Sequence, residues 1–170
     1  MQYTASKHFS GLTQITTSPT GKYLSVFNQR KGLYEILKLT TGEPVKIKTG
    51  HTKKLQWHFS KDTFAVLSPM NEDGTIGSFA SYVPEGTLIL LLIFEIHDNQ
   101  VALIYRGDSI PNPSTIFGGL YLTVCREEAT FLDWETMKEV GTPYFNPTGV
   151  YWHGQYVIIA YSDEFYICNT

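Results

Sequence analysis

The sequence predicts an all-β fold built from short antiparallel strands. Aromatic residues make up 14% of the 170 residues, with 11 Tyr and 10 Phe, and such side chains favour strands. No segment keeps the apolar repeat of about 3.6 residues that a helix packed on a core requires. Similar patterns of strands and turns also return at intervals of about 40 residues, as they do in repeat proteins. These three observations predict small sheets and argue against a helical fold.

The first part of the chain reads as four strands separated by polar turns. Pro19 presets the backbone and Gly21 supplies a left-handed position, so residues 18–22 have the chemistry of a tight turn. The strands expected here cover residues 12–17, 23–28, 33–40 and 45–47. Short turns of this kind join neighbouring antiparallel strands.

A similar pattern then begins again. Residues 55–68 align with residues 13–27 at an offset of about 42. The aligned pairs include Ile15 with Trp57, Ser18 with Ser60 and Tyr23 with Phe64. Related starts follow near Ile116 and Tyr151. A period near 40 with about four strands in each repeat is typical of a WD40-like β-propeller, so about four blades are expected.

The length bears on how many blades the chain holds. A closed ring of six or seven blades needs roughly 240–280 residues at this period. We therefore expect residues 1–170 to form a single propeller segment, partial or open, with exposed edges. Residues 70–84 are rich in Asn, Asp, Gly, Ser and Pro and are expected to form a long surface loop. After it, strands are expected at residues 88–96 and 101–105, followed by a linker at 109–114.

The last third of the chain repeats the same alternation of strand and turn. Gly118 and Gly119 are expected to allow a bend or a close backbone approach that a side chain would block. The strands expected after them cover residues 120–125, 129–134, 148–152, 155–161 and 164–168. Several of these strands are apolar on both faces, which suits a sheet lying between two neighbours.

The two cysteines, Cys125 and Cys168, lie in apolar strand segments and are expected to be free thiols. Residues 1–10 lack the apolar core of a signal peptide. The longest apolar run, residues 88–94, is far shorter than the ~20 residues of a membrane span. Asn112 and Asn146 are each followed by proline, so neither is a glycosylation acceptor. Together these features predict a cytosolic protein.

The net charge of −3 conceals an uneven distribution. Residues 22–61 carry nine basic and two acidic side chains, hence +7, and the rest of the chain carries four basic and fourteen acidic ones, hence −10. These lysines and arginines either are scattered solvated positions or form a basic face for an acidic partner or membrane surface. Nucleic acid is not expected as a partner, because the aromatic residues lie in strand segments and not among the lysines.

The polar residues that invite a catalytic interpretation are isolated. His58 and His153 follow Trp57 and Trp152, and we expect both histidines to make structural hydrogen bonds. Asp133 ends a strand without a second acid beside it, and Asp163 with Glu164 forms a turn. No spacing typical of a metal site, a phosphate-binding loop or a nucleophile elbow occurs. The sequence predicts no enzyme, no cofactor, no metal site and no small-molecule substrate.

Several of these segments occur in an order that resembles one family, the beta-prime subunit of the COPI vesicle coat (coatomer), in its second WD-repeat propeller. The residues that carry the resemblance are Ser18-Pro19-Thr20-Gly21-Lys22-Tyr23-Leu24, Leu55-Gln56-Trp57-His58-Phe59-Ser60-Lys61-Asp62, Ile116-Phe117-Gly118-Gly119-Leu120-Tyr121-Leu122, Phe131-Leu132-Asp133-Trp134-Glu135, Val150-Tyr151-Trp152 and Asp163-Glu164-Phe165-Tyr166-Ile167. The chain departs from the family pattern at Leu132, Thr123 and Cys125 and over residues 70–96.

The resemblance implies a structural, non-catalytic role in a coat that carries proteins from the Golgi to the endoplasmic reticulum. It implies other coatomer subunits as partners, with the alpha subunit foremost, and peripheral association with Golgi and vesicle membranes from the cytoplasm. The alternative is a WD-repeat interaction module of another cytosolic complex, including the coatomer alpha subunit. The resemblance assigns no partner-binding residues, and the cargo-binding residues of the family's first propeller have no counterpart here.

Overall fold

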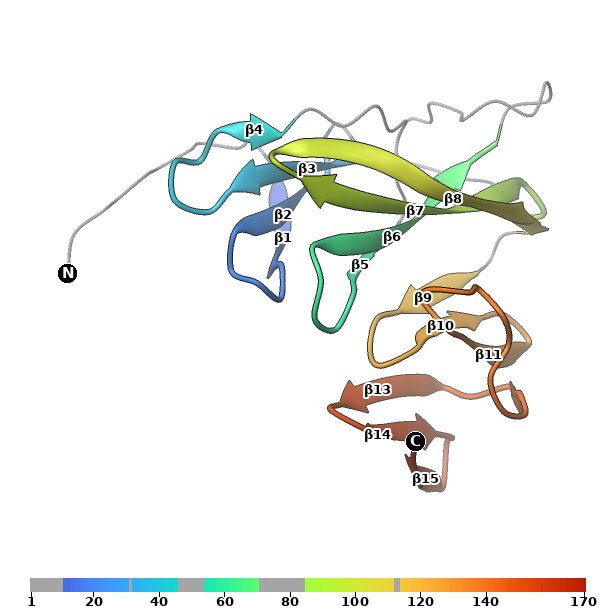
Figure 1. Ribbon diagram of the computed structural model, residues 1–170. Coiled ribbons are helices and arrows are strands. Elements are labelled where there is room, and N and C mark those ends of the chain that lie inside the picture. The colour runs from blue at the N-terminus through green and yellow to red at the C-terminus, as the bar shows by residue number, and fades with distance from the viewer. Residues whose placement is uncertain (1–10, 31, 46–53, 71–84, 112–113) are drawn as a thin grey trace. The chain divides into compact units, whose positions relative to one another are not determined.

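The computed structural model describes residues 11–30, 32–45, 54–70, 85–111 and 114–170. All regular structure in these ranges is β, arranged as small antiparallel sheets (Figure 1). The chain divides into two compact units, Met1–Asn112 and Pro113–Thr170. The prediction of a single propeller segment over residues 1–170 stays a prediction.

The first unit contains two four-stranded sheets, ordered β1-β2-β3-β4 and β5-β6-β7-β8. The strands of the first sheet are β1 (Leu12–Thr17), β2 (Tyr23–Asn28), β3 (Leu33–Lys38) and β4 (Pro44–Val45). Those of the second are β5 (Lys54–Trp57), β6 (Thr63–Pro69), β7 (Leu88–His97) and β8 (Gln100–Pro111). Each sheet is a simple meander in chain order, the topology of a propeller blade.

The second unit contains one four-stranded and one three-stranded sheet, ordered β9-β10-β11-β12 and β13-β14-β15. The strands are β9 (Thr115–Phe117), β10 (Leu122–Cys125), β11 (Glu128–Leu132), β12 (Tyr144–Phe145), β13 (Gly149–His153), β14 (Tyr156–Ala160) and β15 (Phe165–Asn169). With these four sheets, the predicted all-β fold of about four propeller blades is confirmed.

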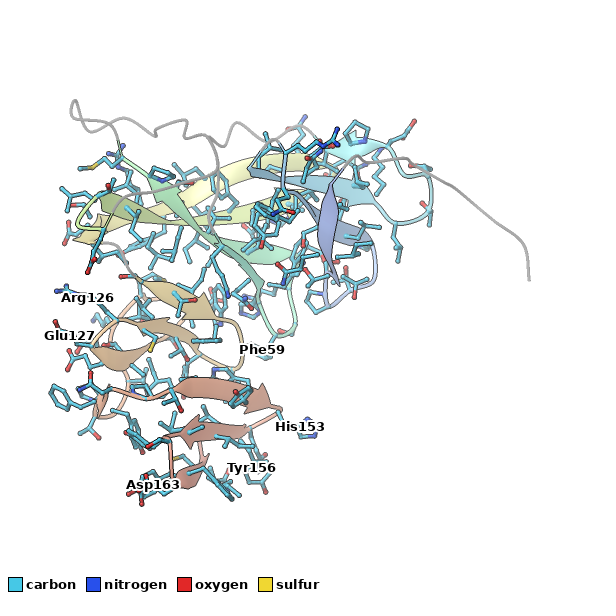
Figure 2. The ribbon with its side chains drawn as sticks, turned by 180° about the vertical axis from the view of Figure 1, so that it is seen from behind. Phe59, Arg126, Glu127, His153, Tyr156 and Asp163 are labelled. Carbon is cyan, nitrogen blue, oxygen red and sulfur yellow. The ribbon has the colours of Figure 1, made fainter. Side chains whose placement is uncertain are left out.

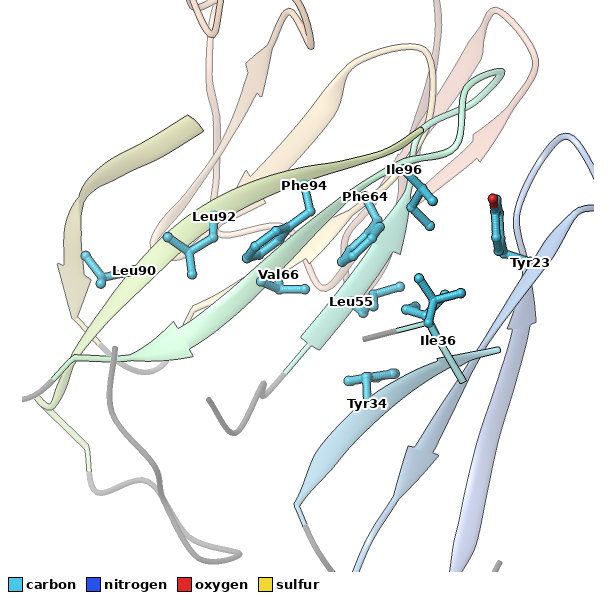
Figure 3. Packing of buried hydrophobic residues seen from close by; sticks show 11 residues of the cluster. Tyr23, Tyr34, Ile36, Leu55, Phe64, Val66, Leu90, Leu92, Phe94 and Ile96 are labelled. Carbon is cyan, nitrogen blue, oxygen red and sulfur yellow. The ribbon is translucent and has the colours of Figure 1, made fainter. Parts of the chain in front are cut away.

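The core of the first unit lies between its two sheets. Tyr23 and Ile36 from the first sheet meet Phe64, Leu92 and Phe94 from the second (Figure 3). The rings of Phe64 and Phe94 stack with centroids 5.5 Å apart, and Phe64 is fully buried. Burying such side chains supplies most of the stability of a sheet pair.

A tryptophan links the two sheets of each unit in the same way. Trp57 at the end of β5 donates a hydrogen bond from Nε1 to Ser25 Oγ on β2, at 3.3 Å. Trp152 on β13 donates from Nε1 to Thr123 Oγ1 on β10, at 3.0 Å. Ser25 and Thr123 are buried, and each hydroxyl accepts a hydrogen bond from the indole N–H of the neighbouring sheet. The two tryptophans therefore have equivalent roles, each in the first strand of the second sheet of its unit.

The offset of the first repeat differs from the one read from the sequence. Thr17 pairs with Leu24 and Trp57 pairs with Phe64, so equivalent hairpin positions are 40 residues apart and not about 42. The alignment of Ile15 with Trp57, Ser18 with Ser60 and Tyr23 with Phe64 is therefore wrong by one or two residues. The two serines suggested that alignment, whereas cross-strand pairing sets the register.

Other predicted boundaries need correction. The segment 109–114 was expected to be a linker, but β8 runs to Pro111 because β7 is long enough to pair with it, across two irregularities in register. β9 and β12 were not predicted as strands, since each is so short that only its neighbour in the sheet defines it. The third strand ends at Lys38. The expected loop 70–84 and the residues after Val45 in the fourth strand lie outside the described residues, apart from Met70.

Candidate partner-binding surface

Within the part of the chain that the structure describes, the strand β15 lies at an edge of the sheet β13–β15. Tyr161 N donates to Glu164 O at 2.8 Å, and Thr170 N donates to Gln155 O at 3.0 Å. In an antiparallel pair the hydrogen-bonded positions alternate along the strand. Tyr166 and Cys168 therefore direct their backbone groups toward β14, and the backbone N–H and C=O groups of Phe165, Ile167 and Asn169 point away from it. Among the described residues, β15 pairs only with β14.

One face of this sheet carries large apolar side chains that are exposed. Tyr151 and Ile158 pair across β13 and β14, and Ile158 and Ile167 pair across β14 and β15, so these three side chains share the face. The exposed fraction is 60% for Tyr151 and 63% for both Phe165 and Ile167. Contiguous apolar surface of this kind is typical of an interaction site.

Tyr156, His153 and Asp163 mark the limits of this face (Figure 2). Tyr156 lies two residues before Ile158 on β14, so its side chain is on the same face. Its cross-strand partners are Asn169 on β15 and His153 on β13. His153 lies at one end of the sheet, beside the β13–β14 turn, and Asp163 lies in the β14–β15 turn at the other. The face thus has an imidazole at one end and a carboxylate at the other.

The opposite face of the same sheet packs on the sheet β9–β12. Val150, Val157 and Ile159 form a buried cluster with Ala129 and Phe131. Beside this cluster a pocket of about 310 Å³ remains. Its lining is mostly apolar: Tyr121, Phe131, Val140, Gly141, Thr142, Tyr144, Val157, Cys168 and Thr170. The pocket therefore lies where β12 of one sheet faces β15 of the next.

The polar atoms of the pocket lie close together. Tyr144 Oη and Cys168 Sγ share a hydrogen bond at 3.1 Å. This hydrogen bond, with burial, raises the pKa of Tyr144. The phenol of Tyr144 therefore stays protonated at neutral pH. The chemistry of the pocket suits an apolar side chain with at most one hydrogen-bonding atom.

The surroundings of β15 are acidic. The second unit carries two basic and seven acidic side chains, a net charge of −5, and no Lys or Arg occurs from residue 141 to residue 170. Glu164 Oε1 accepts a hydrogen bond from the Tyr166 hydroxyl at 3.2 Å, directly before the open edge. This hydrogen bond from Tyr166 to the carboxylate raises the pKa of the phenol. A partner at this edge therefore meets a negative potential.

The predicted structural role of His58 is confirmed. His58 is buried, and its Nδ1 accepts hydrogen bonds from Ser60 N at 3.0 Å and Lys61 N at 3.1 Å. Its ring also stacks on Phe59, with centroids 4.4 Å apart. His153, in contrast, is exposed at the end of β13, so its expected structural hydrogen bond stays a prediction. The two histidines do not share an environment.

Asp133 holds a turn. Its Oδ1 accepts hydrogen bonds from Thr136 N at 2.8 Å, Glu135 N at 3.0 Å and Thr136 Oγ1 at 3.0 Å. The hydrogen bond from Thr136 N is the main reason that the pKa of Asp133 is lowered. Trp134 beside it donates from Nε1 to Gly119 O at 3.0 Å. Because the Asp133 carboxylate accepts these three hydrogen bonds, it stabilises the turn between β11 and β12.

Gly119 confirms the predicted close approach. A Cβ atom built on Gly119 would overlap the indole ring of Trp152. The backbone of Gly119 therefore lies directly against this ring, between the two sheets of the second unit. No other residue type fits there without displacing the tryptophan.

Both cysteines are free thiols, as predicted. Burial raises the pKa of the Cys125 thiol, so it stays protonated at neutral pH and is a weak nucleophile. Within the described parts of the chain, no group of three or more His, Cys, Asp or Glu side chains is arranged to hold a metal ion. No helix in those parts is long and apolar enough to cross a membrane.

The structure bears only partly on the predicted basic face. Lys31, Lys46, Lys48 and Lys53 lie outside the described residues. Lys38 pairs with Glu43 at 3.2 Å, and Lys22 and Arg30 are exposed. A basic face over residues 22–61 therefore stays a prediction.

Sequence reasoning assigned no partner-binding residues. The residues Phe165, Tyr166 and Ile167 read as a strand apolar on both faces, which indicates a covered strand and not an exposed one. Among the residues that the structure describes, no sheet covers the face of β13–β15 that carries Phe165 and Ile167, and cover by a neighbouring sheet is not a local property of the sequence. The nearest signal was the absence of basic residues after position 140 together with this apolar run. Searches of protein-family models and of curated proteins find no match to this chain.

Proposed function

We propose that this protein is a non-catalytic scaffold that binds other proteins through its propeller-type sheets. The observation that carries the proposal is the sheet β13–β15, which exposes Tyr151, Phe165 and Ile167 on one face. Exposed aromatic and aliphatic side chains of this size favour association, because their burial removes apolar surface from water. The face is formed by regular, paired strands, so a partner would meet it pre-organised.

The finer proposal is a place in the COPI coat, as part of a beta-prime type coatomer subunit. It rests on the ordered motifs of the sequence, and the roles of their residues are consistent with it. Trp57 and Trp152 each link a sheet to the preceding one, Gly119 lies against Trp152, and Trp134 bonds to Gly119. In this proposal the protein acts in the cytoplasm, on Golgi and vesicle membranes, with the alpha subunit as its main partner.

A second candidate is an interaction module of another cytosolic complex, including the coatomer alpha subunit. The exposed face of β13–β15 favours this candidate as much as the first, because its chemistry suits any partner with a complementary apolar surface. Neither candidate involves catalysis, a cofactor, a small-molecule substrate or nucleic acid.

The two candidates differ in which proteins accompany the chain from cells. The test is affinity purification of the tagged 170-residue chain from cell extract, followed by identification of the bound proteins. The first candidate predicts coatomer subunits in stable proportion, with the alpha subunit among the most abundant. The variant Phe165→Lys with Ile167→Lys should lose them, and because both side chains are exposed it should still fold. Repeated recovery of a different complex, lost in the same variant, supports the second candidate. Recovery that the variant does not change contradicts the proposed surface.

A further inference from the structure

A hydrogen bond between the tips of two turns joins the two sheets of the first unit. Thr20 lies in the turn between β1 and β2, and Asp62 lies in the turn between β5 and β6. The Thr20 hydroxyl donates to Asp62 Oδ1 at 2.5 Å. Thr20 is exposed, so another protein can reach its hydroxyl. The contact therefore combines a link between sheets with a position at the surface.

Further hydrogen bonds hold both turns in place. In the first turn, Gly21 N donates to Ser18 O at 3.0 Å. In the second, Asp62 O accepts a hydrogen bond from Ile96 N on β7 at 2.9 Å. The Thr20 hydroxyl and the Asp62 carboxylate thus meet at fixed positions, and neither turn can move aside without the loss of such bonds.

We propose that Thr20 is a phosphorylation site whose modification separates the two turns. A kinase would transfer the terminal phosphoryl group of a nucleoside triphosphate to Thr20 Oγ1. The bond between this phosphorus and the bridging oxygen breaks, a bond to Oγ1 forms, the nucleoside diphosphate leaves, and the hydroxyl proton passes to a base of the kinase. The phosphate carries about −1.5 to −2 charges at neutral pH, and Oγ1 then has no proton to donate. Beside Asp62, the modification replaces an attraction with repulsion between like charges.

The sequence around Thr20 has the charge pattern of a kinase substrate. Lys22 follows Thr20 by two residues, and residues 1–34 contain no Asp or Glu. A kinase with an acidic substrate groove selects basic residues close to the hydroxyl, because opposite charges attract and like charges exclude other substrates. The segment from Thr20 to Lys22 therefore suits a kinase of this class.

Thr136 provides an internal comparison. Lys138 follows it by two residues, and its hydroxyl also donates to a carboxylate, Asp133 Oδ1, at 3.0 Å. Both partners of this contact lie in one turn, so a phosphate on Thr136 would disturb that turn and no link between sheets. The adjacent Glu135 also opposes binding to an acidic groove. Thr20 is therefore the preferred site.

The first experiment asks whether Thr20 is phosphorylated. The full chain is incubated with ATP and purified Ser/Thr kinases that select basic residues after the hydroxyl, and mass spectrometry locates the phosphate. The tagged chain is also purified from cells in the presence of phosphatase inhibitors. We expect phosphate on Thr20 in both preparations, and Lys22→Glu should lower the initial rate with the kinases at least about fivefold. Absence of phosphate from Thr20 in either preparation overturns the proposal, even where Thr136 is modified.

The second experiment asks whether the phosphate separates the turns. Hydrogen exchange with mass spectrometry compares the phosphorylated and the unmodified chain. We expect amides in residues 18–28 and 55–66 to exchange at least about threefold faster after phosphorylation, with residues 114–170 unchanged. In Asp62→Asn the side chain keeps an acceptor oxygen for Thr20 but has no charge. Phosphorylation of this variant should therefore accelerate exchange much less.

Two contrary results would overturn the separation of the turns. Equal acceleration in the chain and in Asp62→Asn would show that repulsion by Asp62 is not the cause. Unchanged or slower exchange after phosphorylation would show that the phosphate leaves the turns together.

A pair of variants tests the same repulsion without a kinase. Thr20→Glu places a carboxylate beside Asp62, and Thr20→Gln is the neutral control of similar size. The urea midpoint of Thr20→Glu should be the lower of the two, and the difference should vanish when each is combined with Asp62→Asn. Equal midpoints for Thr20→Glu and Thr20→Gln would contradict a charge-sensitive contact at this position.

Discussion

The sheets β5–β8 and β13–β15 have the same meander topology, but they differ in how far their strands are buried. All seven residues of β6 are buried, and both of its edges are paired, by β5 and β7. In β15 four of five residues are exposed, and one edge is paired among the residues that the structure describes. Both strands are rich in apolar residues, so composition does not separate them. The comparison shows that cover in a repeated sheet depends on the neighbouring sheet and strand, which differ from one repeat to the next.

The strongest test of this comparison replaces one phenylalanine in each sheet. Phe64→Ala removes a fully buried ring stacked on Phe94, and we expect the free energy of unfolding to fall by about 3–5 kcal/mol. Phe165→Ala removes a ring that is 63% exposed and should cost less than about 1 kcal/mol. Urea denaturation of both variants and the unchanged chain measures the difference. Equal losses would mean that β15 is covered in solution.

A second test concerns the contact between the two sheets of the second unit. Gly119→Ala places a methyl group on the indole ring of Trp152, and we expect a loss of about 1–3 kcal/mol from overpacking. Gly141→Ala is a control in which no atom lies near the added Cβ and only the positive φ of 72° is disturbed.

The double variant Gly119→Ala with Trp152→Leu separates the clash from other effects. If the loss comes from the indole ring, the double variant should lose less than the sum of the two single losses. Strict additivity, measured by urea denaturation, would contradict the close approach of Gly119 to Trp152.

The hairpins show what the sequence predicts well. The bounds of β1 and β2 agree with the expectation because Pro19 and Gly21 define the turn locally, and Gly21 has the positive φ, 71°, that was inferred. β8 was predicted to end too early, since Asp108, Ser109 and Pro111 read as loop residues. Pairing with β7 overrides that local preference.

The candidate surface was harder to predict for the same reason. The sequence shows that Phe165 and Ile167 belong to a strand, but their exposure depends on which strands and sheets surround it. His58 illustrates the opposite case. Its position at a turn next to Trp57 was enough to predict a structural role, because the hydrogen bonds to Ser60 and Lys61 are local. Local roles are readable from the sequence, and open edges are not.

A third test uses pH to examine the turn that connects β11 and β12. The pKa of Asp133 is lowered from its ordinary value of 3.8, so its ionised form stabilises the fold. This contribution is fully present above the unfolded pKa and is lost as pH falls through the lower, folded pKa, so it should disappear below about pH 4. Asp133→Asn removes the titration but keeps one acceptor oxygen.

Stability of the chain and of Asp133→Asn should therefore converge as pH falls below about 4, in urea denaturation at a series of pH values. Thr136→Val, which removes the hydroxyl donor 3.0 Å from Asp133 Oδ1, should reduce the same pH dependence in part. A constant difference between the chain and Asp133→Asn from neutral to acidic pH would show that Asp133 does not stabilise the turn through its charge.

The smallest expected effect concerns Ser68, near the end of β6 in the sheet β5–β8. Ser68 is fully buried, and its Oγ has no hydrogen-bond partner among the described residues. A buried hydroxyl without a partner costs about 1–3 kcal/mol, so Ser68→Ala should leave stability unchanged or raise it by about 1 kcal/mol. Ser25 is a matched control, because it is equally buried but its Oγ accepts the hydrogen bond from Trp57 Nε1. Ser25→Ala should therefore destabilise the fold while Ser68→Ala does not, as measured by the urea midpoint of each variant. Similar losses in both variants would mean that Ser68 has a partner in solution, and that β6 is closed by polar contacts as well as by apolar packing.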